Sequence, residues 1–172
     1  MRPFAGAPAD LKALTFLNDA PPPREFWARR QAHETTIHMV DALAASLGRL
    51  PTADQAAIDQ GIASDGVDEL LCGFFTRGRC KLYDGREYTL VVAPEDTPRR
   101  WVVHVAPGLT VDIVDGGGDE RHGGDDGDAD ARIAGSAAQI YLALWNRGDQ
   151  PKLAGRSDVL DRWRSTQRVR WS

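Results

Sequence analysis

The sequence contains little cysteine, no excess of positive charge and no long apolar run. Only two of its 172 residues are cysteines, Cys72 and Cys80, and their spacing matches no metal-binding motif. Cys72 lies in a short apolar run, which favours a buried structural thiol over a catalytic one. The formal net charge of -4 gives no global field that would attract nucleic acid or an anionic membrane, so neither is expected as a partner.

Signals for export and for membrane insertion are missing as well. No apolar stretch approaches the roughly 18 residues that a membrane-spanning helix needs, and the N-terminus lacks the basic region and apolar core of a secretory signal. We therefore expect a cytoplasmic location. Residues 1–23 are instead rich in Pro, Gly and Ala and end in three consecutive prolines, which predicts an extended, weakly ordered leader.

The chain does contain enough apolar residues, 42% of the total, to bury a core. Their spacing fits helices in the first half of the chain, and from residue 85 it changes to the alternation of strands. The predicted helices cover residues 24–47, a stretch from 52 or 54 onward, 66–76 with Asp65 as cap, 136–145 and 157–163. The predicted strands cover residues 88–92, 101–105, 109–113, 132–133 and 152–155.

One acidic, glycine-rich segment, residues 115–130, has almost no apolar residues. It lacks the ordered ligand spacing and the closing glutamate of an EF-hand calcium loop. We expect a solvated loop, because such a segment cannot bury enough apolar surface to order itself. His122 lies inside this segment, which makes it a poor candidate for a metal ligand.

The predicted helix over residues 24–47 carries two metal-ligating residue types one turn apart. Glu34 and His38 are four residues apart, so both side chains can reach one ion, and Asp41 follows on the same stripe. A carboxylate and an imidazole suit Zn²⁺ or another borderline divalent ion. The alternative is an ordinary amphipathic helix with a neighbouring acid and histidine, because two residues at this spacing often occur by chance. A catalytic zinc also needs a third protein ligand.

Three stretches extend this pattern along the chain. Residues 26–42 read F-W-A-R-R-Q-A-H-E-T-T-I-H-M-V-D-A, residues 65–71 read D-G-V-D-E-L-L, and residues 135–147, after the strand-rich region, read G-S-A-A-Q-I-Y-L-A-L-W-N-R. In this order they resemble the actinobacterial mycothiol-dependent maleylpyruvate isomerase family. The resemblance implies a DinB-like metal-binding helical bundle followed by a sterol-carrier-like domain.

We therefore expect an α+β fold. A residual N-terminal helical segment, the partial DinB-like region of residues 1–62, is followed in residues 63–172 by a sterol-carrier-like α/β domain with a mainly antiparallel sheet and flanking helices. The resemblance also implies two cofactors, a divalent metal with zinc as the expected ion, and mycothiol. A third possibility, an apolar ligand carried by the C-terminal domain, rests on fold analogy alone.

Carried over by motif, Glu34 and His38 match two of the family's three metal ligands. The third is a histidine on an earlier helix, in a region that precedes this sequence, so the missing donor is expected from His33, from another chain or from residues upstream of Met1. The resemblance also places Arg147 nearest to a catalytic role, in which its charge would stabilise the dianionic substrate and its enolate. An arginine that only complements a helix dipole is the alternative.

The activity implied by the resemblance is the mycothiol-dependent isomerisation of maleylpyruvate, in which a thiolate adds to the activated double bond and leaves after rotation. The alternative is a non-catalytic remnant that acts as a binding or dimerisation module. A helix without the rest of its bundle exposes an apolar face, and partners normally cover such faces. We therefore expect a homodimer, or a separate N-terminal half, bound through the helix that carries Trp27 and Ile37.

Overall fold

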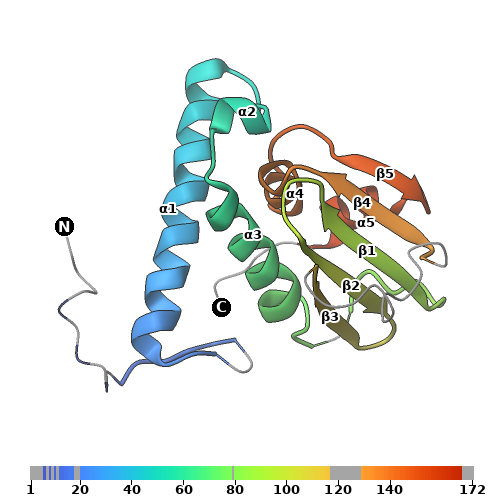
Figure 1. Ribbon diagram of the computed structural model, residues 1–172, viewed down its shortest axis with the longest axis horizontal. Coiled ribbons are helices and arrows are strands. Elements are labelled where there is room, and N and C mark those ends of the chain that lie inside the picture. The colour runs from blue at the N-terminus through green and yellow to red at the C-terminus, as the bar shows by residue number, and fades with distance from the viewer. Residues whose placement is uncertain are drawn as a thin grey trace.

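The computed structural model describes residues 6, 8, 10, 12–17, 20–78, 80–116 and 129–167. These residues form a long helix, shorter helices and a five-stranded sheet (Figure 1). The helices are α1 (Pro23–Leu47), α2 (Ala53–Ala56), α3 (Gln60–Asp68), the π-helix η1 (Glu69–Phe74), α4 (Ala137–Leu144) and α5 (Val159–Thr166). The strands are β1 (Tyr88–Pro94), β2 (Arg99–Val105), β3 (Leu109–Asp115), β4 (Ala131–Gly135) and β5 (Lys152–Gly155). The predicted α+β class is confirmed.

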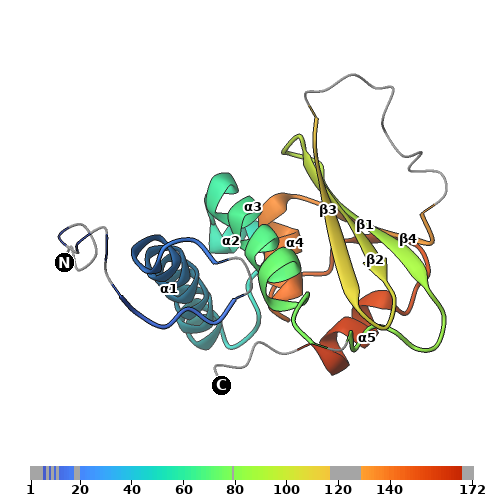
Figure 2. The ribbon, with the colours of Figure 1, turned by 90° about the horizontal axis from the view of Figure 1, so that it is seen from below.

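The sheet is mainly antiparallel, as predicted. Its strands run in the order β3-β2-β1-β4-β5; β1 and β4 are parallel and the other neighbouring pairs are antiparallel. Because side chains alternate along a strand, Tyr88, Leu90 and Val92 of β1 all point to one face, where they are buried in the core. Helices α3, α4 and α5 gather on one side of the sheet (Figure 2).

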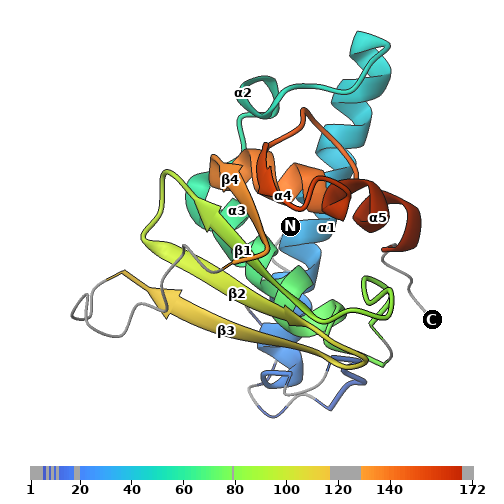
Figure 3. The ribbon, with the colours of Figure 1, turned by 90° about the vertical axis from the view of Figure 1, so that its right-hand side faces the viewer.

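The core lies between the sheet and these helices. Trp101 of β2, Ile133 of β4, Ile140 of α4 and Trp163 of α5 are completely buried in it. The indole N–H of Trp101 donates to a carboxylate oxygen of Asp68 at 3.1 Å, so its polar atom also has a partner. Figure 3 shows α4 and α5 beside each other along one side of the strands. Within the described part of the chain, no helix is both long and apolar enough to cross a membrane.

Helix α1 begins at a proline and ends before a glycine. Pro23 lies in the first turn, where its missing N–H costs no helical hydrogen bond. Gly48 ends the helix with a φ of 66°, a left-handed conformation that glycine adopts without strain. The helix lies beside α3 on the side away from the sheet (Figures 1 and 2). The predicted helix over residues 24–47 is confirmed.

Helix α3 begins earlier than predicted. Its N-cap is Asp59, whose carboxylate accepts hydrogen bonds from the backbone N–H groups of Gly61 and Ile62 at 2.9 and 3.1 Å. The sequence interpretation used Asp65 as the cap, but Asp65 lies inside the helix and pairs with side chains of α1. The predicted division of the chain at residue 62 falls within α3.

The leader is better packed than predicted at residues 14–17. The ring of Phe16 packs edge-on against Phe26 and Trp27, with centroid distances of 5.0 and 5.9 Å. The indole N–H of Trp27 donates to the carbonyl of Leu14 at 3.0 Å. These residues therefore pack against the start of α1, a contact that the composition of the leader did not predict. Residues 117–128, with His122 and most of the predicted acidic loop, lie outside the described residues.

Candidate metal half-site

Glu34 and His38 lie side by side on α1. Glu34 Oε2 and His38 Nε2 are 3.5 Å apart, as the spacing of one helical turn allows. The side chain of His38 is 75% exposed and that of Glu34 is 22% exposed, so solvent and ions reach both. The structure therefore brings these two predicted ligands together.

Both side chains border an open groove along one flank of α1, between its buried and its exposed face. Its volume is about 470 Å³, and its lining residues, Trp27, Arg30, Gln31, Glu34, Thr35 and His38, all belong to α1. A groove lined by a single helix has no second wall, so a ligand or another helix can approach Glu34 and His38 directly.

The buried Arg30 donates a hydrogen bond to the carboxylate of Glu34. Its Nη2 atom donates to Glu34 Oε1 at 2.9 Å, which leaves Oε2 on the side of His38. Nη1 of the same guanidinium pairs with Glu69 of η1, and both Arg30 and Glu69 are 1% exposed. An outer-shell partner of this kind orients a ligating carboxylate without taking its free oxygen. Neither Arg30 nor Glu69 was selected as a site residue from the sequence.

Burial of Glu69 disfavours the charged form of its carboxyl group. Burial raises the pKa of its carboxyl above the ordinary value, against the opposing effects of Arg30 and His33. Its second oxygen, Oε1, is buried and has no hydrogen-bond partner among the described residues. The pair with Arg30 favours the charged form of this carboxylate and so opposes the effect of burial.

His33 faces the opposite side of α1 and does not belong to the groove. Its Nε2 lies 2.8 Å from Asp65 Oδ2, its Nδ1 lies 3.2 Å from the hydroxyl of Tyr141, and its side chain is 1% exposed. Both ring nitrogens are thus engaged in the interior. His33, one of the three sources named for the missing donor, is turned away from Glu34 and buried between helices, so it does not join Glu34 and His38 in one group.

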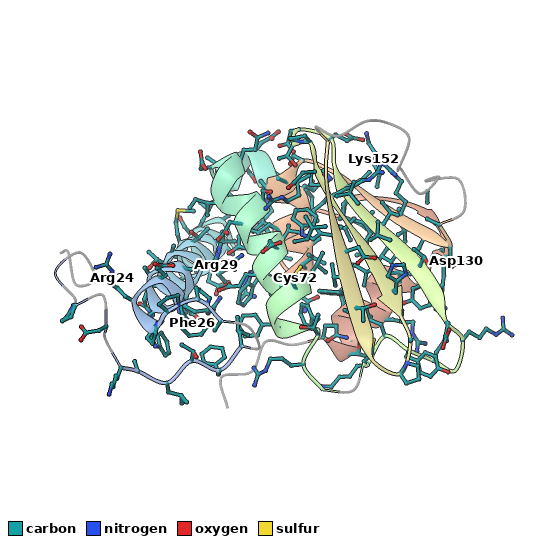
Figure 4. All side chains as sticks on the ribbon, turned by 60° about the horizontal axis from the view of Figure 1, so that its bottom comes forward. Arg24, Phe26, Arg29, Cys72, Asp130 and Lys152 are labelled. Carbon is teal, nitrogen blue, oxygen red and sulfur yellow. The ribbon has the colours of Figure 1, made fainter. Side chains whose placement is uncertain are left out.

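Asp65 joins this interior cluster to a second arginine. Arg29 donates to Asp65 Oδ2 at 2.9 Å and to Asp68 Oδ2 at 3.0 Å, and it lies between α1 and α3 (Figure 4). Burial opposes ionisation of Asp65, but the contacts with His33 and Arg29 outweigh it, and the pKa of the carboxyl is lowered. The inner side of α1 is therefore fixed to α3 by ionic contacts.

Asp41 and Arg147 pair with each other. The guanidinium donates through Nε and Nη2 to the two oxygens of Asp41, at 2.5 and 2.8 Å, and through Nη1 to the carbonyl of Trp145 at 2.8 Å. This hydrogen bonding lowers the pKa of Asp41. Asp41, which the sequence places on the stripe of Glu34 and His38, thus uses both carboxylate oxygens for Arg147, and the charge of Arg147 is already engaged by this carboxylate. The catalytic role of Arg147 stays a prediction.

Cys72 is a structural thiol in this fold. It is half-buried, and burial, reinforced by Asp68, raises its pKa to about 12. A thiol with so high a pKa is a poor nucleophile near neutral pH. Cys72 and Cys80 are both free.

The donor set fits zinc in kind but is incomplete in number. Among the residues that the structure describes, no group of three or more His, Cys, Asp and Glu side chains is placed to hold a metal ion. Glu34 and His38 are thus a half-site. The chain matches no protein-family model and none of the curated proteins compared with it. The resemblance to the maleylpyruvate isomerase family accordingly stays a prediction.

Proposed function

We propose that this chain is a mycothiol-dependent maleylpyruvate isomerase-like metalloprotein in which α1 contributes two donors to a divalent-metal site. The observation that carries the proposal is the 3.5 Å separation of Glu34 Oε2 and His38 Nε2 at the rim of an open groove. Two donor atoms, each about 2.1 Å from a tetrahedral zinc ion, lie about 3.4 Å apart. The side chains are therefore spaced as two ligands of one zinc ion.

The contacts beneath Glu34 support the same role. Arg30 is buried, donates to one oxygen of Glu34 and is itself held by Glu69. These two contacts fix the direction of the Glu34 carboxylate before an ion binds, which lowers the entropy lost on binding. When bound, the metal would stabilise the thiolate of mycothiol, which adds to an activated electrophile. Because two donors are fewer than a catalytic zinc needs, another donor must join them.

A second candidate function is a non-catalytic binding or dimerisation module. The observation that favours it is the bidentate pair between Asp41 and Arg147, which occupies the cation expected to bind the dianionic substrate. Under either function we propose a cytoplasmic location, with which the two free cysteines agree.

Zinc content of protein purified without an affinity tag separates the two functions. We expect bound zinc in the wild type and its loss in Glu34→Ala and in His38→Ala. The matched control is His104→Ala, because His104 and Asp112 form another exposed histidine and carboxylate pair, 3.0 Å apart, on the sheet. Zinc that survives both α1 substitutions, or that disappears equally in His104→Ala, would contradict the metal site. Metal-free protein with an unchanged melting temperature in both α1 variants would support the second function.

A further inference from the structure

The sheet has two edges that differ in how well they resist the pairing of a further strand. Within the described part of the chain, β5 borders only β4 and β3 borders only β2. Strand β5 has four residues, carries Lys152 and ends at Gly155, whose φ is 73°. Short length, a lysine and a departure from extended geometry all hinder pairing with another strand. The β5 edge is therefore poorly suited to a partner.

The β3 edge has none of these features. Its seven residues, Leu109–Asp115, pair without interruption with the seven residues of β2, and they include no proline, glycine or lysine. In an antiparallel ladder, alternate residues turn their N–H and C=O groups away from the neighbouring strand. Figure 3 shows β3 as the outermost strand of the sheet. Strand β3 therefore presents a row of backbone donors and acceptors that another strand can use.

Two apolar side chains extend the core towards this edge. Val111 and Ile113 of β3 lie opposite Val103 and Trp101 of β2, which are both buried, so they are on the core face of the sheet. Ile113 is nevertheless 47% exposed. A strand added beside β3 would place its own side chains next to Val111 and Ile113. Apolar side chains at those positions would remove the exposed surface of Ile113 from water.

Asp112 lies between these two residues and points to the opposite face of the sheet. Its side chain is 73% exposed, and His104 of β2 contacts one of its oxygens, Oδ2, at 3.0 Å. The other carboxylate of β3, Asp115, uses both oxygens for Arg99 of β2. Strand β3 itself contains no basic residue. A cationic side chain on an added strand would therefore be stabilised beside Asp112.

We propose that β3 binds an extended peptide segment of another protein, in which one basic residue lies between two apolar residues. The segment adds a sixth strand to the sheet through backbone hydrogen bonds. Its apolar side chains pack beside Val111 and Ile113, and its lysine or arginine contacts Asp112. This order is the same in both chain directions, so parallel and antiparallel addition both satisfy it. Binding at β3 requires neither Glu34 nor His38, which lie on α1.

A second copy of β3 is a poor occupant of the same edge. In an antiparallel pair of β3 strands, Asp112 would face Thr110, Asp112 or Val114 of the other copy, depending on the register. None of these side chains is a cation, and two facing carboxylates repel each other. The net charge of -4 on each copy also favours a basic partner over self-association.

Backbone amide NMR signals of the full chain test this proposal during addition of a seven-residue peptide of alternating valine and lysine. We expect saturable shifts in the signals of β3, whereas those of β5 keep their positions. Two control peptides should bind at least tenfold more weakly. The first carries N-methyl groups on its amides and cannot donate backbone hydrogen bonds. The second has glutamate in place of lysine and brings a like charge to Asp112.

Either of two results with these peptides would overturn strand addition. One is equal binding of the N-methylated peptide, since its side chains alone would then account for the affinity. The other is the absence of shifts in β3 at millimolar concentrations of the valine and lysine peptide. A chain that dimerises without peptide, with β3 amides protected from hydrogen exchange in the dimer, would also overturn the proposal, because a second copy would then occupy the edge.

Asp112→Lys separates the local contact from general attraction between an acidic protein and a basic peptide. We expect this variant to prefer the glutamate peptide, which reverses the order found for the wild type. Asp54→Lys is the matched control, because Asp54 is exposed on α2 and its replacement changes the net charge equally. This control should keep the wild-type order. The same change of preference in both variants would overturn the role of Asp112.

Discussion

The inner and outer sides of α1 each place a histidine beside a carboxylate, and the two pairs have opposite surroundings. On the inner side His33 lies 2.8 Å from Asp65 and is 1% exposed, with Tyr141 at its other ring nitrogen. On the outer side His38 lies 3.5 Å from Glu34 and is 75% exposed. The same kind of pair, a histidine with a carboxylate, is thus packed in the interior on one side and open to solvent on the other. The difference lies in their partners, which the residue types alone do not reveal.

The largest loss of stability should come from breaking the buried ion pair between Arg30 of α1 and Glu69 of η1. Glu69→Ala leaves the buried guanidinium of Arg30 with one carboxylate fewer and opens space in the interior. We expect a loss of about 3 kcal/mol in the free energy of unfolding. Urea denaturation measures it. A loss below about 1 kcal/mol would mean that the pair is not needed to dock α1.

A close contact between α3 and α4 holds Tyr141 in place beside His33, which in turn contacts Asp65. A Cβ atom at Gly66 would overlap the ring of Tyr141, whose hydroxyl contacts His33. Gly66→Ala should therefore destabilise the fold by about 1–3 kcal/mol, since the helices must move apart. Gly108→Ala is the control, because nothing lies within 4 Å of its added Cβ. Thermal unfolding compares the two variants, and equal melting temperatures would contradict the close packing.

The helix and strand predictions succeeded where the spacing of apolar residues decides the structure. The 24–47 helix follows three prolines and ends at Gly48, and the alternation after residue 85 fits the observed strands. Contacts between distant residues could not be predicted in this way. Arg147 and Asp41 are 106 residues apart, and Tyr141 and His33 are 108 apart. Their pairing depends on how the finished helices pack.

One overlooked signal did lie in the sequence. Arg30 and His33 fall on the same four-and-three series as Phe26, Ile37 and Val40, all of which are buried. That series predicts an inward position for both polar residues, and their need for partners then points to an acidic neighbouring helix. The early start of α3 had a similar signal in Asp59, a favoured N-cap residue.

Acidification should weaken the contacts of Asp65 with His33 and Arg29. The pKa of Asp65 is lowered in the folded protein, so the stability from its contacts is present above the unfolded-state pKa and is lost as the pH falls through the lower, folded-state value. We expect the melting temperature of the wild type to fall more steeply below about pH 4 than that of Asp65→Asn. Parallel slopes in a series of thermal scans would contradict the stabilising role of these contacts.

The pair between Asp41 and Arg147 should contribute less, because both side chains are partly exposed. Their exposed fractions are 42% and 29%. A double-mutant cycle with Asp41→Ala and Arg147→Ala should give a coupling of about 1 kcal/mol. Zero coupling would show that the arginine is available for another role, including the predicted contact with an anionic substrate.

The smallest effect on stability should come from the outer pair. His38→Ala removes an exposed side chain, so the free energy of unfolding of the metal-free protein should change by less than about 0.5 kcal/mol. The comparison with Glu69→Ala then separates a residue kept for binding from one kept for packing. A large destabilisation by His38→Ala would assign the outer pair a structural role.

The most direct test is to follow the imidazole NMR signals of the four histidines while zinc is added to metal-free protein. The account predicts that the signals of His38 move or broaden first and that those of His33 keep their positions. It also predicts that Glu34→Ala abolishes the response of His38. An unaltered His38 at saturating zinc, or a response that begins at His33, would contradict the claim that the outer side of α1 carries the metal donors.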